Sequence, residues 1–161
     1  MKTILHSIIL STLFITFSIA NIINVPADQP TIQAGIDAAA NGDTVLVADS
    51  TYYENINYNG RIISVMSTYP NDPSIVEATI VDGGQNDLVV TFENGEGVGS
   101  VLYGFTVTNG FAHNGGGIFC DGASPVIMNN LISGNKASWV IGSGGGIFCK
   151  NHSAPIITNN N

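Results

Sequence analysis

Hydrophobic residues follow two different periods along this chain. Near the amino end, Ile32 and Ile36 recur at helical spacing, Thr31 can cap the start of a helix, and Gly42 stands where a helix end would be capped. This pattern predicts one short helix over residues 31–40. After Gly42, brief apolar runs rich in Val, Ile, Thr and Phe are separated by Gly, Asn, Asp or Pro. Such runs predict many short strands and no second helix.

The carboxyl-terminal half of the chain repeats itself. The hexapeptide GGGIFC stands at residues 115–120 and again at residues 144–149. GFTVTNG at residues 104–110 aligns with NNLISGN at residues 129–135, 25 positions later. The extra residues of the second copy fall between the apolar runs, as expected when strands stack on their own copies and loops absorb changes of length. A repeat of this size, with short strands and no helix, predicts one coil of a parallel β-solenoid, because a single coil cannot bury its apolar face alone.

The repeat also predicts which residues lie side by side in neighbouring coils. Three pairs are expected in register: Ile118 with Ile147, Cys120 with Cys149 and, on the opposite face, Phe119 with Phe148. Asn129 and Asn130 correspond to Asn159 and Asn160, so Asn side chains at matching turns can form ladders. An antiparallel sandwich is the main alternative, since its strands are also short, but it gives no reason for matching positions to recur.

A family resemblance rests on several of these segments. VPADQPTIQAGIDAAANGDTVLVADSTYYENI, followed by GFTVTNG and GGGIFCDGASPVIMNNLISGN, resembles the amino-terminal cap and first coils of secreted right-handed parallel β-helix proteins with the pectin lyase-like fold. The resemblance implies an all-β, right-handed parallel β-helix with a short amino-terminal capping helix. It implies less about activity, because the family includes pectate lyases, polygalacturonases, alginate-modifying enzymes and many surface proteins with no known catalysis.

The first residues have the composition of an export signal. Lys2 precedes an apolar run from about Ile8 to Phe17, and Ser18 and Ala20 form an A-x-A-like cleavage site. A membrane anchor is the alternative, but the run is shorter than the roughly 20 residues that cross a bilayer. We therefore expect a signal peptide at residues 1–20, one domain at residues 21–161 without a membrane span, and a secreted or cell-surface location.

The charge pattern argues against nucleic acid as a partner. Only 10% of the residues are charged, and the formal net charge is −8. The four basic residues are too few and too scattered to neutralise a row of phosphates. They are Lys2, Arg61, Lys136 and Lys150.

The residues do not assemble a catalytic set, and we expect no metal and no cofactor. Asp43, Asp82 and Asp121 each stand beside a Gly, where an Asp most often serves a turn. His113 and His152 have no His or Cys neighbour at metal-ligand spacing. The acidic residues therefore indicate turns rather than a hydrolytic or lyase site.

The two cysteines match across the repeat, which leaves two readings of their state. Export would expose Cys120 and Cys149 to an oxidising environment that permits a disulfide. Directly stacked parallel strands, however, hold the two side chains side by side, a poor geometry for the disulfide torsion. The geometry favours a pair of buried thiols and leaves a disulfide as the alternative.

Four aromatic residues are candidates for ligand contact, because aromatic faces stack on sugar rings and exposed loops commonly carry binding function. They are Tyr52, Tyr53, Tyr58 and Trp139. The alternative is packing, since TYYENINYNG can alternate between the two faces of an early strand and Trp139 can fold over the side of the solenoid.

Two function classes remain. The leading hypothesis is a binding or structural passenger whose long regular face contacts a polysaccharide or another cell-surface ligand. The alternative is a polysaccharide lyase or glycoside hydrolase of the same fold whose catalytic coils lie beyond residue 161. The chain ends at PIITNNN within a repeat, so we expect a domain truncated at its carboxyl end. Its uncovered strand edges would allow end-to-end self-association of the isolated fragment.

Overall fold

The computed structural model describes residues 19–138 and 143–161, so residues 1–18 of the predicted signal peptide lie outside the described residues. The largest sheet has the strand order β1-β2-β5-β8-β12-β16. Its strands are β1 (Ile22–Val25), β2 (Thr44–Val47), β5 (Ser64–Ser67), β8 (Val101–Tyr103), β12 (Val126–Met128) and β16 (Ile156–Thr158).

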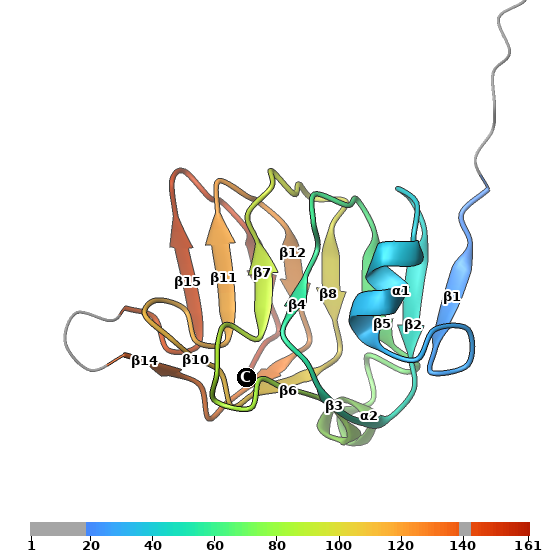
Figure 1. Ribbon diagram of the computed structural model, residues 1–161, viewed down its shortest axis with the longest axis horizontal. Helices are drawn as coiled ribbons and strands as arrows, with labels where there is room; N and C mark the ends of the chain where they lie inside the picture. Colours follow the sequence, from blue (N-terminus) through green and yellow to red (C-terminus); the bar gives the residue numbers. More distant parts are fainter. Residues whose placement is uncertain (1–18, 139–142) are drawn as a thin grey trace, which may run out of the picture.

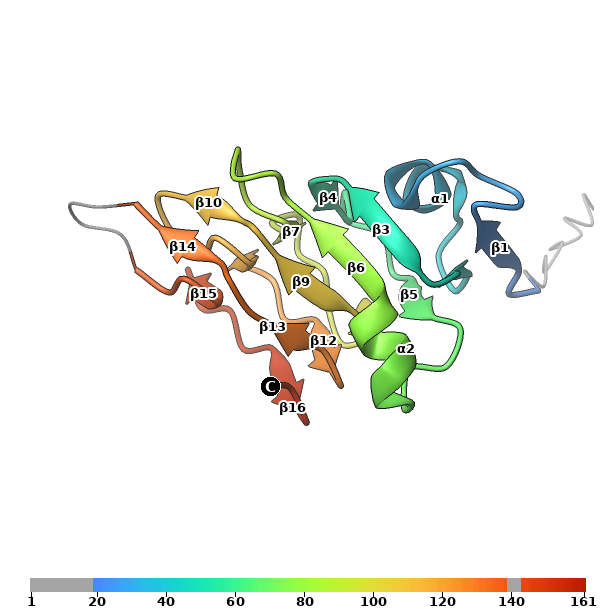
Figure 2. The ribbon, with the colours of Figure 1, turned by 90° about the horizontal axis from the view of Figure 1, so that it is seen from below.

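Two four-stranded sheets and one strand pair complete the β-structure. The order β3-β6-β9-β13 is made by β3 (Ser50–Tyr53), β6 (Thr79–Asp82), β9 (Thr106–Thr108) and β13 (Leu131–Ile132), visible together in Figure 2. The order β4-β7-β11-β15 is made by β4 (Ile56–Asn57), β7 (Val90–Phe92), β11 (Ile118–Asp121) and β15 (Ile147–Lys150). Strand β10 (Phe111–Ala112) pairs with β14 (Lys136–Ala137).

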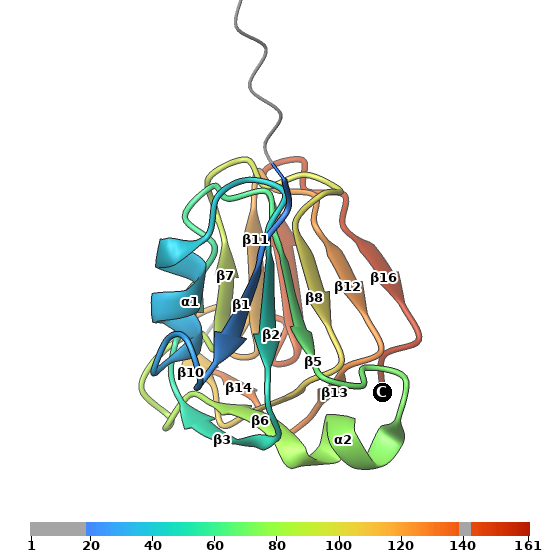
Figure 3. The same cartoon turned by 90° about the vertical axis from the view of Figure 1, so that its right-hand side faces the viewer.

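The chain visits the three larger sheets in a fixed cyclic order. After β2 it enters β3 and then β4, each in a different sheet, and returns with β5 beside β2 (Figure 1). The same order of sheets recurs through β6, β7 and β8 and continues to β16. Viewed along the long axis, the strands surround a common interior (Figure 3).

All strand pairs among the described residues are parallel. Strands β11 and β15 pair in the predicted register, with Ile118 opposite Ile147, Phe119 opposite Phe148 and Cys120 opposite Cys149. The predicted all-β class with parallel pairing is confirmed, and the antiparallel alternative is wrong.

The core is built from rows of matching side chains that point inward from successive strands. In the six-stranded sheet, Val45, Val65, Leu102 and Ile127 are paired in register and fully buried. In the sheet containing β11, the inward row includes Ile56, Val90 and Ile118. Because side chains alternate between the two faces of a strand, the residues before and after each inward residue point to the outer face.

Helix α1 (Ile32–Ala38) forms where the helical spacing predicts it. The Thr31 side chain accepts a hydrogen bond from the Ala34 backbone N–H at 3.1 Å, and Ile32 and Ile36 are fully buried. Gly35 allows close packing, because a Cβ at this position would lie 2.8 Å from Cγ1 of Val45. The helix ends earlier than predicted: Ala39 is its cap and has extended backbone angles.

A second helix, α2 (Pro73–Ala78), lies between β5 and β6 and corrects the expectation of a single helix. Asp72 caps it by accepting a hydrogen bond from the Ser74 backbone N–H at 2.9 Å, and Pro73 occupies its first turn. With six residues, α2 is too short to produce a recognisable 3.6-residue pattern. The Asp-Pro start signal was the only local indication of it.

A buried Asn ladder connects the turns that follow the strands of the six-stranded sheet. Asn130 is 2% exposed, and its Oδ1 accepts from the Phe105 N–H at 2.9 Å. Its Nδ2 donates to the Leu102 carbonyl at 3.2 Å and to Asn160 Oδ1 at 3.0 Å. Asn160 in turn donates to the Ile127 carbonyl at 2.8 Å. The ladder therefore satisfies backbone groups of two successive turns, and Asn130 does so where water does not reach.

Removing the centre of the Asn ladder is expected to destabilise the protein. Asn130→Ala leaves the Phe105 N–H and the Leu102 carbonyl buried without this partner, which should lower the free energy of unfolding by about 2 kcal/mol. Denaturant titration measures this change. Asn86→Ala, at an exposed position, is the matched control and should stay within about 0.5 kcal/mol of the parent. Equal effects of the two substitutions would contradict a stabilising ladder.

Candidate functional site

The outer face of the β4-β7-β11-β15 sheet carries a row of side chains that we call the outer row: Asn57, Thr91, Phe119 and Phe148. Their neighbours Ile118 and Cys120 are fully buried, so Phe119 points to the opposite, outer side of β11. The rings of Phe119 and Phe148 are stacked with centroids 6.1 Å apart and an interplanar angle of 19°. Stacking of coils thus places two aromatic rings, 29 positions apart in sequence, against each other, with Phe119 8% exposed and Phe148 partly buried.

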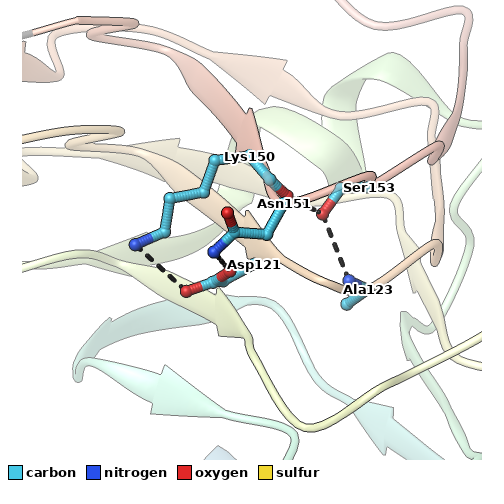
Figure 4. A network of polar contacts seen from close by, with 5 residues as sticks. All are labelled: Asp121, Ala123, Lys150, Asn151 and Ser153. Atoms are coloured by element: carbon cyan, nitrogen blue, oxygen red, sulfur yellow. Dashed lines mark hydrogen bonds and ion pairs between the residues drawn. The ribbon is translucent and has the colours of Figure 1, made fainter.

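A charged network borders the two rings (Figure 4). Lys150 Nζ lies 3.0 Å from Asp121 Oδ2, and Asn151 donates from its side chain to Asp121 Oδ1 at 2.7 Å. The ammonium group also lies 5.0 Å from the centroid of the Phe119 ring. Such a distance permits a favourable cation–π contact. The side chains of Lys150 and Asp121 remain 42% and 26% exposed, so the network stays open to solvent and to a ligand.

The same contacts set the protonation of Asp121. Its pKa is lowered from the ordinary value of 3.8, first by the contact with Lys150 and then by the hydrogen bond from Asn151. The carboxylate is therefore ionised at neutral pH, and its favourable contacts are lost only as the pH falls through this lowered pKa. A carboxylate with a lowered pKa is a weak proton acceptor, so this group suits binding and positioning better than general acid–base chemistry.

The loop after β15 is tied to the loop after β11. Ser153 Oγ accepts from the Ala123 N–H at 3.1 Å and donates to the Lys150 carbonyl at 2.7 Å (Figure 4). Ser124 Oγ accepts from the Ala154 N–H at 3.0 Å. These bonds hold the backbone on which Lys150 and its neighbours are mounted.

The structure separates the aromatic residues that the sequence singled out for ligand contact. Tyr58 is fully buried, with its ring centroid 4.2 Å from that of Phe92 and its hydroxyl donating to the Val101 carbonyl at 2.7 Å. Tyr52 is 8% exposed and donates to a backbone carbonyl. Tyr58 and Tyr52 therefore pack in the protein interior, as the alternative interpretation of these residues states. In contrast, Tyr53 is 78% exposed.

The remaining candidate, Trp139, lies outside the described residues. On the outer face of the β4-β7-β11-β15 sheet, the structure brings together Phe119 and Phe148. The repeated GGGIFC motif predicted their register, but it did not predict their partnership with Lys150, whose ammonium contacts the Phe119 ring. That partnership depends on the Lys that replaces Asp121 at the matching position of the second copy.

The Asp residues expected in turns have this role in the structure. The Asp43 carboxylate accepts from the Asn21 N–H and, across the turn after α1, from the Ala40 N–H, both at 2.8 Å, and these backbone hydrogen bonds lower its pKa. Asp82 accepts from the Gly84 N–H and from the Asn109 side chain, both at 2.8 Å. Asp121 differs, because it ends β11 and binds side chains of the next copy.

Cys120 and Cys149 are both free thiols, in the register that the repeat predicts. Burial raises the pKa of each thiol above its ordinary value. Since the thiolate is the reactive form, both side chains are poor nucleophiles at neutral pH and act as small core residues.

Among residues 19–138 and 143–161, no three His, Cys, Asp or Glu side chains are grouped so that they could hold a metal ion. In the same residues, the helices are too short and too polar to cross a bilayer. The chain matches no known protein family, and no curated protein or solved structure is significantly similar to it.

The different environments of the tyrosines are open to test. Tyr58→Phe removes the hydroxyl that donates to the Val101 carbonyl and should lower the free energy of unfolding by about 1 kcal/mol. Tyr53→Phe, the matched control at an exposed position, should change it by less than about 0.5 kcal/mol. Chemical unfolding of the two variants measures the difference. A larger loss in the Tyr53 variant would mean that the assignment of core and surface is wrong.

Proposed function

We propose that residues 21–161 form a right-handed parallel β-helix of the pectin lyase-like kind that is exported by a signal peptide at residues 1–20. In this proposal the domain is secreted or displayed at the cell surface and acts as a binding or structural passenger that contacts glycans. The outer row is the observation that carries the binding function, because it places the partly exposed Phe148 ring, stacked on the buried Phe119, beside a partly exposed Lys.

The cyclic order of the sheets supports the β-helix. Each return to the six-stranded sheet places a new strand beside the previous one, in parallel and in register. The buried Asn ladder at successive turns supports the same arrangement, since it requires equivalent turns to lie directly beside one another. A solenoid of this kind extends by repeating one unit and produces long outer faces of regular spacing.

The chemistry of the outer row supports a glycan as the ligand. Aromatic rings offer apolar faces against which the C–H faces of a sugar ring pack. The Lys150 ammonium and the Asn151 amide lie at the border of these rings and supply hydrogen-bond groups for hydroxyl or carboxylate oxygens. The combination fits a polysaccharide strand lying along the outer face.

The purified chain is expected to be retarded in native gels that contain a polysaccharide it recognises. The panel consists of polygalacturonate, pectate, alginate, xylan, glucan and mannan. Phe148→Ala should weaken binding about ten-fold, since losing an aromatic contact removes roughly 1.5 kcal/mol. Val98→Ala, which shortens an exposed apolar side chain elsewhere, is the control and should not change binding.

Two results would contradict this function. The first is migration unchanged by every polysaccharide of the panel. The second is release of unsaturated or reducing sugars during incubation, which would favour the lyase or hydrolase alternative instead.

We also propose that the isolated chain self-associates through the outer edge of β16. Within the described residues β16 pairs only with β12, on one side. The Ile156 N–H donates to the Pro125 carbonyl at 2.9 Å, so the N–H of the next residue, Ile157, points away from β12. An edge strand with free backbone groups can pair with an edge of another molecule.

Sedimentation velocity tests this association. The parent chain should form larger species as its concentration rises, whereas Ile157→Pro should shift it toward monomer because it removes an outward N–H. Ile156→Pro is the matched control: it removes the bond to Pro125 and should lower stability without blocking the outer edge. A parent chain that stays monomeric at high concentration would contradict the proposal.

A further inference from the structure

A cleft of about 300 Å³ opens between α2 and the turns that follow β12 and β16. We call it the α2 cleft. One wall is formed by Pro73, Val76 and Glu77 of the helix, and the other includes Asn129, Leu131 and Asn159. Its volume lies at the lower end of the range for small-ligand sites. None of the outer row contributes to it, so it is a separate surface.

The helical wall of the α2 cleft is fixed to the sheets. Thr106 Oγ1 donates to the Val76 carbonyl at 2.9 Å, and Thr79 Oγ1 donates to the Ile75 carbonyl at 2.7 Å. The segment leading into α2 packs Pro70 directly on Gly104, which has a φ of +82° and no room for a side chain. The wall is therefore preorganised and does not have to be ordered when a ligand binds.

The opposite wall is held by a second set of contacts. Asn129 has a φ of +53°, and its Nδ2 donates to Asn71 Oδ1 at 2.7 Å. The same Asn71 oxygen accepts from the Tyr103 hydroxyl at 2.7 Å, which fixes the orientation of both amides. Asn129 Oδ1 is consequently left buried and without a donor among the described residues. The side-chain hydrogen bonds of Asn71 therefore fix this wall as well.

The lining favours a ligand that carries hydrogen-bonding groups and no negative charge. The Glu77 carboxylate accepts hydrogen bonds, and the Asn amides both donate and accept them. Arg61, Lys136 and Lys150, the basic residues of the described chain, do not line the cleft. Pro73, Val76 and Leu131 supply an apolar surface between these groups. Hydroxyl donors together with one apolar face are the features of an uncharged pyranose ring.

We propose that the α2 cleft binds a neutral sugar residue and rejects uronates. This inference rests on the proposed glycan-binding function and adds to it a second contact, with a charge preference set by Glu77. A ligand carboxylate beside the Glu77 carboxylate would be repelled, and no cation in the lining offsets that repulsion.

The test is calorimetric titration of the full chain with matched probes. Neutral oligosaccharides of glucose, xylose and mannose are compared with oligogalacturonates of equal length. The parent chain should bind at least one neutral probe. Glu77→Lys should weaken that binding about ten-fold and produce binding of oligogalacturonate. Asp87→Lys makes the same charge change at an exposed position in the β6–β7 loop and should alter neither.

The outcomes separate this inference from the function on which it rests. If Phe148→Ala weakens the binding of a neutral oligosaccharide and Glu77→Lys does not, the proposal for the α2 cleft is overturned and the outer row remains the glycan site. Oligogalacturonate binding that appears equally with Asp87→Lys would also overturn it, because net charge would then be the cause. Failure of every probe to bind, in gels and by calorimetry, would overturn both. Thermal unfolding of each variant confirms that it is folded.

Discussion

Lateral hydrogen bonding between parallel strands of successive turns is the constraint on which the other features of this protein depend. In a parallel pair, each bonded residue uses its N–H and its carbonyl on the same neighbouring strand, so the register is set residue by residue. Strand β11 illustrates this constraint, because it pairs in register with β7 on one side and with β15 on the other. Ile118, Phe119 and Cys120 therefore have matching neighbours in both directions.

This constraint places side chains of similar chemistry in rows along the sheets. Inward rows become continuous apolar layers, as with Val65, Leu102 and Ile127. Ser67 Oγ is buried without a partner among the described residues, whereas other polar side chains enter the interior at places where backbone groups satisfy them. Asn130 occupies such a place, and so does Glu96, which is 2% exposed and accepts from the N–H groups of Gly60 and Asn94. These buried polar contacts specify the turns and compensate for groups that water cannot reach.

On the outside, the same stacking creates surfaces from residues far apart in the chain. The pairing that aligns Phe119 with Phe148 also places Lys150 beside Asp121. Helix α2 interrupts the path from β5 to β6, yet β6 still joins β3 and β9 in register. An insertion at a turn can therefore add a wall and a cleft without disturbing the sheets. Figure 2 shows helix α2 at the end of the path from β5 to β6.

The sequence by itself determined the parallel class, the β11–β15 register and the position of α1. The reason is that stacking repeats a local pattern, so an offset between two copies of GGGIFC reports directly which residues are neighbours. Tertiary structure alone decided that Tyr58 and Tyr52 face the core while Tyr53 faces solvent. In TYYENINYNG the polar and aromatic residues alternate with too little contrast to mark an inner face, and burial depends on what packs opposite. Helix α2 likewise owes its place to Thr106 and to the contact of Pro70 with Gly104, which are distant in sequence. Local propensity over six residues cannot encode contacts of that range.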